Sequence, residues 1–318
     1  MSPADVVDTL LDRSVLPGFS TIGYRVRRPS WDESDPAAGS MAGKVAVVTG
    51  AGSGLGKATA TALARLGASV HLVVRDVAKG RTAADDIKAA VPGSTVLVHR
   101  CDVSELGSVR AFTAELSGSV DRVDVLVHNA GTMPPERTET ADGHELALAT
   151  HVLGPVLMTE LLRPVLRAAR GARVVLVSSG GMYARRLPVA DPELREGTYA
   201  GATAYARSKR IQVALTPLMQ ERWAADGIAV HAMHPGWVDT PGIVTSLPGF
   251  HKVMRPLLRD VDSGADTVVW LAATEPPPGG GLFWHDRAPR PEHVLPGTRE
   301  RPGEVRQVWD VVTRATGL

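Results

Sequence analysis

Residues 44–56 read KVAVVTGAGSGLG and begin with four small apolar residues, Val45 to Val48, that carry no charge. Such a run suits a strand that is buried on both faces of a parallel sheet. Glycine then occupies every second position from 50 to 56, ahead of a helix-like run over residues 57–66. A glycine-rich turn lets backbone N–H groups approach a phosphate, and the helix behind it adds the positive end of its dipole. The stretch therefore predicts a nucleotide site, with a plain strand-to-helix connection as the alternative.

Strand-like and helix-like stretches alternate along the rest of the chain. Further strands are expected at residues 69–74, 95–100, 123–127, 173–177, 228–233 and 282–284. Helices are expected at residues 78–91, 105–116, 142–170, 203–225 and 263–273. This rhythm predicts an α/β fold, a Rossmann-type doubly wound parallel sheet of about seven strands with helices on both faces. Ligands in such sheets bind beyond the carboxyl ends of the strands.

The expected domain covers residues 44–286, with an N-terminal extension and linker at 1–43 and a C-terminal extension at 287–318. Residues 304–314 are expected to form a last helix. In the N-terminal extension, an apolar helical stripe is formed by Val7, Leu10, Leu11 and Val15. The acids Asp5, Asp8 and Asp12 face elsewhere, whereas a membrane-surface helix normally carries lysine and arginine. We therefore expect this helix to dock on the main domain.

Composition excludes several classes of protein. The 318 residues are 44% hydrophobic with a formal net charge of +1, which gives no general attraction to nucleic acid or to an anionic membrane. The only cysteine, Cys101, cannot form an intrachain disulfide, so a cytoplasmic location is expected. We expect no integral membrane segment, because no apolar run approaches the length of a span. No metal site is expected, since Leu148 stands where an H-E-x-x-H motif from His144 needs its second histidine.

A tyrosine and a lysine four residues apart carry the clearest chemical signal. Tyr205 and Lys209 lie on one face of a predicted helix, where the ammonium would favour the phenolate and lower the pKa of the phenol. Ser178 and Ser179 end a buried strand at the edge of the sheet where ligands bind. An isolated Y-x-x-x-K would be two surface residues, and serines at a strand end often only turn the chain. Their combination favours acid–base chemistry on a bound ligand.

These motifs resemble the short-chain dehydrogenase/reductase family over residues 44 to about 284. The family's N-A-G motif stands at residues 129–131 and its P-G motif at 235–236. The segments VSSGGM, YARSK, MHPGWVDTPG, LPGFH and GADTVVWLA are similar to the branch called dehydrogenase/reductase member twelve. The resemblance implies an NAD(P)-dependent oxidoreductase that interconverts a carbonyl and an alcohol by hydride transfer.

The resemblance also implies a role for individual residues. Tyr205 would be the proton donor or base, Lys209 would lower its pKa and hold the nicotinamide ribose, and Ser179 would hydrogen-bond the substrate oxygen. Tyr183 and Tyr199 are not candidates, since neither has a lysine four residues on. Besides Tyr205 and Lys209, the expected cofactor-binding residues are Gly50, Ser53, Gly54, Leu55, Gly56, Arg75, Asp102, Val103, Asn129, Ala130, Gly131, Pro235, Gly236, Val238 and Thr240.

One position departs from the family pattern. Where the family usually has an asparagine whose carbonyl holds a proton-relay water, this chain has His151. Pro155 has no N–H, so the helical bond to the carbonyl of residue 151 cannot form. We expect a kinked helix and a free carbonyl that preserves the relay, with the imidazole as an extra shuttle. The alternative is that His151 only fills space and that the relay is weakened.

The end of the second predicted strand bears on the cofactor. Val74 stands where NAD-binding members of the family place aspartate, and Arg75 follows it. A guanidinium suits a 2′-phosphate, so NADP is the expected cofactor. Asp76, twenty residues past Gly56, keeps NAD as the alternative.

Substrate specificity is expected in a mobile loop near residues 238–262 and in the segment between Ser179 and Tyr205. The loop carries scattered apolar residues, which favours a lipophilic carbonyl or alcohol. Arg185 and Arg186 could meet an acidic substrate group. The main alternative function is a catalytically weak scaffold or sensor that binds NADP(H). The resemblance implies a homodimer through the long helix expected at residues 142–170 and the helix that carries Tyr205, although the terminal extensions could cover that surface.

Overall fold

The computed structural model describes residues 3–318, with side chains from residue 7 onward, so the side chain of Asp5 lies outside the described part. Within it, eight strands form one sheet in the order β3-β2-β1-β4-β5-β6-β7-β8. The strands are β1 (Val45–Thr49), β2 (Ser69–Val74), β3 (Val96–Arg100), β4 (Val125–His128), β5 (Arg173–Val177), β6 (Ala229–Met233), β7 (Leu282–His285) and β8 (Ala288–Pro289). β1 to β7 run parallel, and only the two-residue β8 is antiparallel. The predicted doubly wound parallel sheet is confirmed, with β8 as an unforeseen edge strand.

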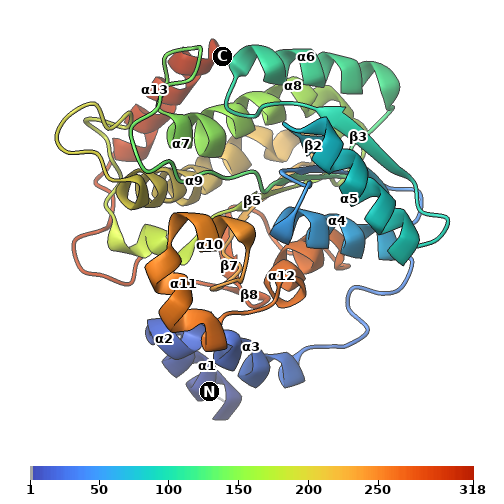
Figure 1. Ribbon diagram of the computed structural model, residues 1–318, viewed down its shortest axis with the longest axis horizontal. Coiled ribbons are helices and arrows are strands. Elements are labelled where there is room, and N and C mark those ends of the chain that lie inside the picture. The colour runs from blue at the N-terminus through green and yellow to red at the C-terminus, as the bar shows by residue number, and fades with distance from the viewer. Residues whose placement is uncertain (1–2) are drawn as a thin grey trace.

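Helices cover both faces of this sheet. One face carries α4 (Gly54–Arg65), α5 (Val77–Ala90) and α12 (Val261–Ala273). The other carries α6 (Leu106–Ser119), α8 (Gly154–Ala168) and α9 (Gly201–Trp223). Figure 1 shows α6 and α8 on one side of the strands and α4 and α12 on the other. The central strands β4 and β5 are buried throughout, as their unbroken apolar runs predict.

The expected helix at residues 142–170 is not one continuous helix. It consists of α7 (Leu146–Leu148), a π-helical turn (Ala149–Leu153) and α8, and Pro155 lies just after the turn. The N–H of Gly154 reaches back to the carbonyl of Ala149, five residues earlier, in place of the usual four. A proline that lacks a donor explains why the regular pattern changes here.

Within residues 146–168, one 18-residue stretch has a mean hydropathy of 1.2, so this helix could span a membrane by length and composition. In this fold, 78% of that stretch is buried among other parts of the protein. It therefore has the character of a core helix.

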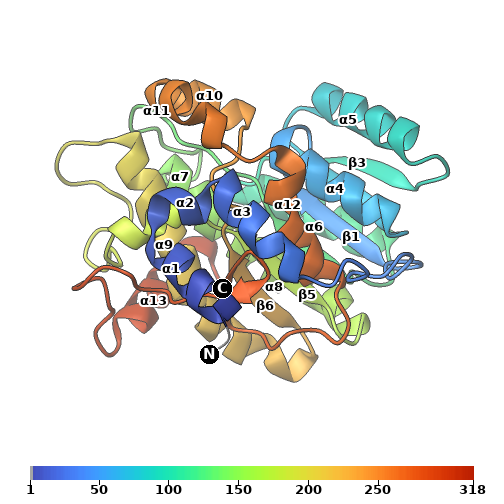
Figure 2. The same ribbon diagram turned by 90° about the horizontal axis from the view of Figure 1, so that it is seen from below.

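Short helices form both extensions and the loop before α12. The N-terminal ones are α1 (Pro3–Arg13), α2 (Val15–Phe19) and α3 (Thr21–Arg27). The expected mobile loop folds as α10 (Pro241–Ser246) and α11 (Pro248–Met254), and the chain ends with α13 (Glu304–Thr316). Single 3₁₀ turns lie at Arg28–Ser30, Gly180–Ala184, Ala224–Asp226 and Arg255–Leu257. Figure 2 shows α1, α2 and α3 in front of the sheet in the view from below.

The C-terminal helix α13 packs on α8 and α9, the two helices through which the family resemblance implied a dimer. Val308, Trp309 and Val312 are buried there, and Arg222 of α9 lies over the Trp309 ring. Burial of three such side chains stabilises this contact by several kcal/mol, at about 1.5–3 kcal/mol each. The extension thus covers part of the surface that a dimer of that kind would use.

Candidate active site

A cleft of about 760 Å³ opens at the carboxyl ends of β1 and β4. These strands are neighbours in the sheet, and the strand order reverses between them, so the cleft lies at the topological switch point. Every residue expected to bind the cofactor lines this cleft, and so does Ser179. His151 does not line it and lies directly behind Gly131.

The glycine-rich turn leaves no room for a side chain at Gly50 or Gly56. Gly50 has φ of +65°, which favours glycine. A Cβ on Gly56 would lie 2.5 Å from the carbonyl oxygen of Gly50 and 2.4 Å from the Asn129 amide nitrogen. The N-terminus of α4 begins at Gly54, on the wall of the cleft. This bare backbone at a helix N-terminus fits a dinucleotide phosphate.

Asn129 and Thr49 tie the ends of β4 and β1 together beside this turn. The Asn129 side-chain amide donates to the Thr49 carbonyl at 2.9 Å. The Thr49 hydroxyl in turn accepts from the backbone N–H groups of Asn129 and Ala130, each at 3.0 Å. These bonds hold the ends of β1 and β4 together at the switch point.

Arg75 and Asp76 differ in the contacts that their side chains make with the rest of the protein. The Arg75 side chain is 79% exposed, and its guanidinium lies 3.8 Å from the Asp102 carboxylate. Asp76 caps α5, accepting from the backbone N–H groups of Ala78 and Lys79 at 3.0 and 3.2 Å. The Asp76 carboxylate is therefore partly occupied by the hydrogen bonds that cap α5, while the Arg75 guanidinium remains available to a ligand.

Tyr205, Lys209 and Ser179 meet at the inner end of the cleft. The Ser179 hydroxyl is hydrogen-bonded to the Tyr205 phenol, and Lys209 Nζ lies 5.6 Å from the centroid of the tyrosine ring. Lys209 is buried, and its ammonium donates to the carbonyl of Val177 at 2.7 Å. The predicted trio is thus assembled from β5 and from one face of α9.

The protonation of this trio differs from the sequence expectation. Burial raises the pKa of Tyr205, and the Ser179 hydrogen bond lowers it by less. Burial also lowers the pKa of Lys209 to about 7. The expected lowering of the phenol pKa by Lys209 is wrong for this structure, because desolvation of the phenolate is the larger effect. The phenol is consequently held in its protonated form at neutral pH.

The His151 imidazole is fully engaged. Its Nε2 accepts from the backbone N–H of Thr132 at 3.0 Å, so its Nδ1 carries the proton and donates to the Ser208 hydroxyl at 2.8 Å. Ser208 donates onward to the carbonyl of Tyr205 at 2.8 Å. Burial and then the charge of Lys209 hold the pKa of His151 well below its usual value. Because both nitrogens of the His151 ring are already hydrogen-bonded, the ring has none left to act as the expected extra proton shuttle. Through Ser208 it instead positions the turn of α9 that contains Tyr205.

The His151 carbonyl is also not free, contrary to expectation. Pro155 removes its helical partner, but the Gln212 side chain on α9 donates to it at 2.7 Å. The other end of that amide, Gln212 Oε1, is buried and has no partner among the described residues. Sequence reasoning missed Gln212, although its place three residues after Lys209 on one helix face was a usable signal.

The N-terminal helices support the wall of the cleft opposite Tyr205. Arg259 packs so closely on Gly236 that a Cβ there would lie 2.5 Å from Arg259 Nε. The backbone N–H of Trp237 donates to the carbonyl of Phe19 at 2.8 Å. The Phe19 ring also fills the space beside Gly180, directly after Ser179. Residues before the expected domain therefore shape the site, which no motif indicated.

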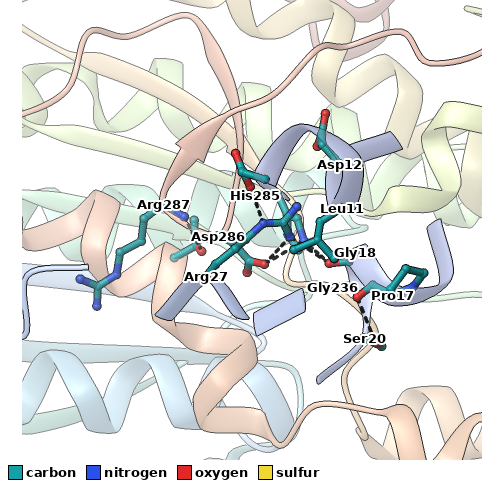
Figure 3. Close-up of polar contacts among 12 residues, drawn as sticks. Leu11, Asp12, Pro17, Gly18, Ser20, Arg27, Gly236, His285, Asp286 and Arg287 are labelled. Atoms are coloured by element: carbon teal, nitrogen blue, oxygen red, sulfur yellow. Dashed lines mark hydrogen bonds and ion pairs between the residues drawn. The ribbon is translucent and has the colours of Figure 1, made fainter. Parts of the chain in front are cut away.

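A buried ionic cluster locks these helices in place. Asp286 binds Arg27 at 2.8 Å and Arg259 at 2.5 Å, and each of these three side chains is at most 4% exposed. Both guanidinium groups also donate to the carbonyl of Gly18. Figure 3 shows Arg27 pointing toward Asp286 and Gly18. Burial by itself would raise the pKa of Asp286, but its neighbours, His285 and Arg259 foremost, lower it below its usual value.

Two other expectations concern arginines of the segment between Ser179 and Tyr205. Neither Arg185 nor Arg186 lines the cleft. Arg185 donates to the Thr203 hydroxyl at 3.0 Å, and Arg186 donates to the carbonyl of Gly297. The expectation that they could meet an acidic substrate group is wrong, because both turn toward other parts of the chain.

The sequence pattern of the family described as short chain dehydrogenase matches residues 44–247. The chain belongs to the short-chain dehydrogenase/reductase family. It is 40% identical over 277 residues to Dehydrogenase/reductase SDR family member 12 of Bos taurus, covering 85% of each chain. It is 35% identical over 281 residues to Retinol dehydrogenase 12 of Homo sapiens, covering 87% of this chain and 88% of that one.

A solved structure shows the same fold nearly end to end. The crystal structure of an uncharacterized protein from Mycobacterium paratuberculosis superposes with a TM-score of 0.69 at 31% identity, covering 90% of this chain and 97% of that one. Short-chain dehydrogenases are NAD(P)-dependent oxidoreductases, and the predicted family membership is confirmed by these comparisons. The predicted resemblance to the member twelve branch is confirmed as well.

Proposed function

We propose that this protein reduces a lipophilic carbonyl compound, or oxidises the corresponding alcohol, with Tyr205 as the acid or base. The observation that carries the proposal is the Tyr205 phenol, hydrogen-bonded to Ser179 at the inner end of a dinucleotide cleft. A bound nicotinamide cofactor would supply or accept the hydride. Gly50, Gly54 and Gly56 would face its phosphates, and Asp102 its adenosine end.

In the reductive direction, each side chain has one task. The Ser179 hydroxyl donates a hydrogen bond to the substrate oxygen and polarises the carbonyl. The protonated Tyr205 phenol then transfers its proton to that oxygen as negative charge develops there. Lys209 stabilises the resulting phenolate, because its ammonium lies one helical turn away in a buried site. In the oxidative direction the phenolate acts as the base.

The apolar residues along the substrate end of the cleft support the lipophilic substrate. Met133, Leu146, Trp237, Ile243 and Phe250 all line it, from three separate parts of the chain. Retinol dehydrogenase 12, whose name indicates a lipophilic alcohol, is among the relatives. The test is NADPH oxidation with a panel of lipophilic aldehydes and ketones. Tight cofactor binding without turnover on any of them would favour the alternative, a scaffold or sensor.

The proposed cofactor is NADP, with Arg75 as the partner of its 2′-phosphate. Arg75→Glu is expected to lower kcat/KM for NADPH relative to NADH by about tenfold or more, since a hydrogen bond to a charged group contributes about 1.5–3 kcal/mol. The control is Arg100→Glu, at the end of the neighbouring strand β3 and outside the cleft. A preference for NADH in the unaltered protein would contradict the assignment.

The proton relay of the family is proposed to run through Gln212. The orphaned Gln212 Oε1 and the second lone pair of the His151 carbonyl are two buried acceptors for one water. That water would return a proton to Tyr205 by way of Lys209.

Gln212→Met is therefore expected to lower kcat about tenfold, less than the roughly 100-fold loss on removal of a general acid itself. The KM for the cofactor should stay the same, and the pH profile of kcat should shift. Thr216→Val is the control, because Thr216 is buried on the next turn of α9 and, among the described residues, its hydroxyl bonds only within that helix. Equal kcat and pH profiles in Gln212→Met and the unaltered protein would remove Gln212 from the relay.

We also propose that the protein is located in the cytoplasm, on the basis of its cysteine. Cys101 is buried, and burial raises the pKa of its thiol to about 11, so it remains a protonated thiol at neutral pH. Fractionation of cells that express the tagged protein would test this location.

A further inference from the structure

The outward faces of α1, α2 and α3 are apolar. The residues on these faces are 44–64% exposed and comprise Val7, Leu10, Val15, Leu16, Ile22 and Val26. Single exposed apolar residues are ordinary on protein surfaces, but a contiguous group of them marks an interaction site. Here six such side chains fall within twenty residues, on three consecutive helices.

Asp8 and Asp12 of α1 do not share this face. Asp8 pairs with Arg27 at 2.6 Å and with Arg290 at 2.7 Å, and Asp12 lies 3.6 Å from Arg290. Both acids therefore turn toward the domain, away from Val7 and Leu10. The sequence-based argument against a membrane-surface helix counted these acids as surface charges, whereas the structure uses them to hold α1 in place.

The charges that remain outside are positive. Arg13, Arg25 and Arg28 are exposed, and the structure shows no ion pair to any of them in the part of the chain that it describes. Between residues 7 and 28, Asp8 and Asp12 are the only acids. The exposed surface of α1 to α3 thus combines apolar side chains with cations, as in helices that lie on an anionic lipid surface.

The helices that border the cleft are linked to α2 by ring contacts and carry further exposed apolar side chains. The Phe19 ring of α2 lies 6.1 Å from Trp237, which lies 5.3 Å from Phe250 of α11. On α10 and α11, Val244 and Val253 are 44% and 75% exposed.

The charges of this second segment have the same sign. Residues 241–257 contain Lys252 and Arg255 but no acid, and both cations are exposed. Phe250 and Ile243 of the same segment line the cleft. The apolar and cationic surface therefore reaches the substrate end of the cleft.

We propose that α1, α2, α3, α10 and α11 form a docking face for an anionic lipid bilayer. The apolar side chains enter the headgroup region, and the arginine and lysine side chains bind lipid phosphates. A second copy of this chain suits the face less well, because a symmetric contact would bring the same cations together. Docking in this orientation would turn the substrate end of the cleft toward the lipid.

The test is co-sedimentation of the full chain with vesicles. Binding is expected with vesicles of phosphatidylcholine mixed with phosphatidylglycerol and not with phosphatidylcholine alone, and high salt should weaken it. The double variant Leu10→Asp/Leu16→Asp should lower the partition coefficient at least about tenfold. The matched control is Leu295→Asp, since Leu295 is equally exposed at 50% but lies in the C-terminal extension.

Several outcomes would overturn the proposal. These are no binding to the mixed vesicles, equal binding by the double variant, or equal loss in the Leu295→Asp control. A dimer in solution that the double variant abolishes would assign the face to a second copy instead. Unchanged thermal unfolding of the double variant would show that the lost binding reflects the surface and not the fold.

Discussion

Replacing Tyr205 with phenylalanine is expected to lower kcat by at least about 100-fold, within the range of about 10²–10⁴ for loss of a general acid or base. The substitution removes only the phenolic oxygen, which is hydrogen-bonded to Ser179 and held protonated by burial. The ring remains, and with it the edge-on contact with His151 at 5.3 Å between centroids. Cofactor affinity and thermal unfolding should therefore change little. Steady-state kinetics with NADPH and the best carbonyl substrate measure the effect.

Two tyrosines provide matched controls. The Tyr199 hydroxyl donates to Glu145 at 2.9 Å, and the Tyr183 hydroxyl donates to the carbonyl of Pro291 at 2.9 Å. Neither residue lines the cleft, so Tyr199→Phe and Tyr183→Phe should retain kcat within a few-fold. Tyr205→Phe with turnover similar to these controls would refute the assignment of the acid.

The sheet could be predicted because its signal is local. Strands that are buried on both faces are continuous apolar runs, so β1, β2 and β5 stand out in any window of the sequence. The two-residue β8 has no such run, and its pairing with β7 is seen only in the folded chain. The glycine-rich turn could also be predicted from the sequence, because its close contacts, such as that of Gly56 with Gly50, involve residues a few positions apart.

The parts of the site that escaped prediction depend on contacts between distant residues. Gln212 meets the His151 carbonyl across 61 positions, and Arg27 meets Asp286 across 259. The partner of a buried charge lies far away in the sequence, and the spacing of residues within one helix or strand does not indicate which residue it is. The raised pKa of Tyr205 could not be predicted for a related reason. The direction of this shift follows from the burial of the phenol in the folded chain and not from its spacing to Lys209.

The N-terminal extension connects these observations. Its inner face carries Phe19, which packs against the wall of the cleft at Gly236, and Arg27, which binds Asp286, and its outer face carries the proposed docking residues. The ion pairs of Asp8 with Arg27 and Arg290 fix α1 on the domain and neutralise its carboxylate. The stability of this extension should therefore depend strongly on the ionic cluster beneath it.

Asp286→Asn is expected to destabilise the protein by about 3–5 kcal/mol, because it leaves Arg259 buried without its anion and removes one of the two carboxylates that bind Arg27. Asparagine keeps the shape of the side chain and tolerates the backbone φ of +51° at this position, so the charge alone is tested. The temperature of unfolding should fall by about 10 °C. Limited proteolysis should also begin to cut within α1 to α3, because the cluster attaches them to the domain.

The pH dependence separates loss of charge from general damage. The folded pKa of Asp286 lies below its unfolded value, so its stabilising effect is present above about pH 4 and is lost as the pH falls further. The gap between the unaltered protein and Asp286→Asn should therefore narrow below about pH 4. Asp86→Asn, which removes the exposed pair with Lys57, should cost less than about 1 kcal/mol. Equal unfolding temperatures for Asp86→Asn and Asp286→Asn would show that the buried cluster does not hold the extension, since burial is what distinguishes the two aspartates.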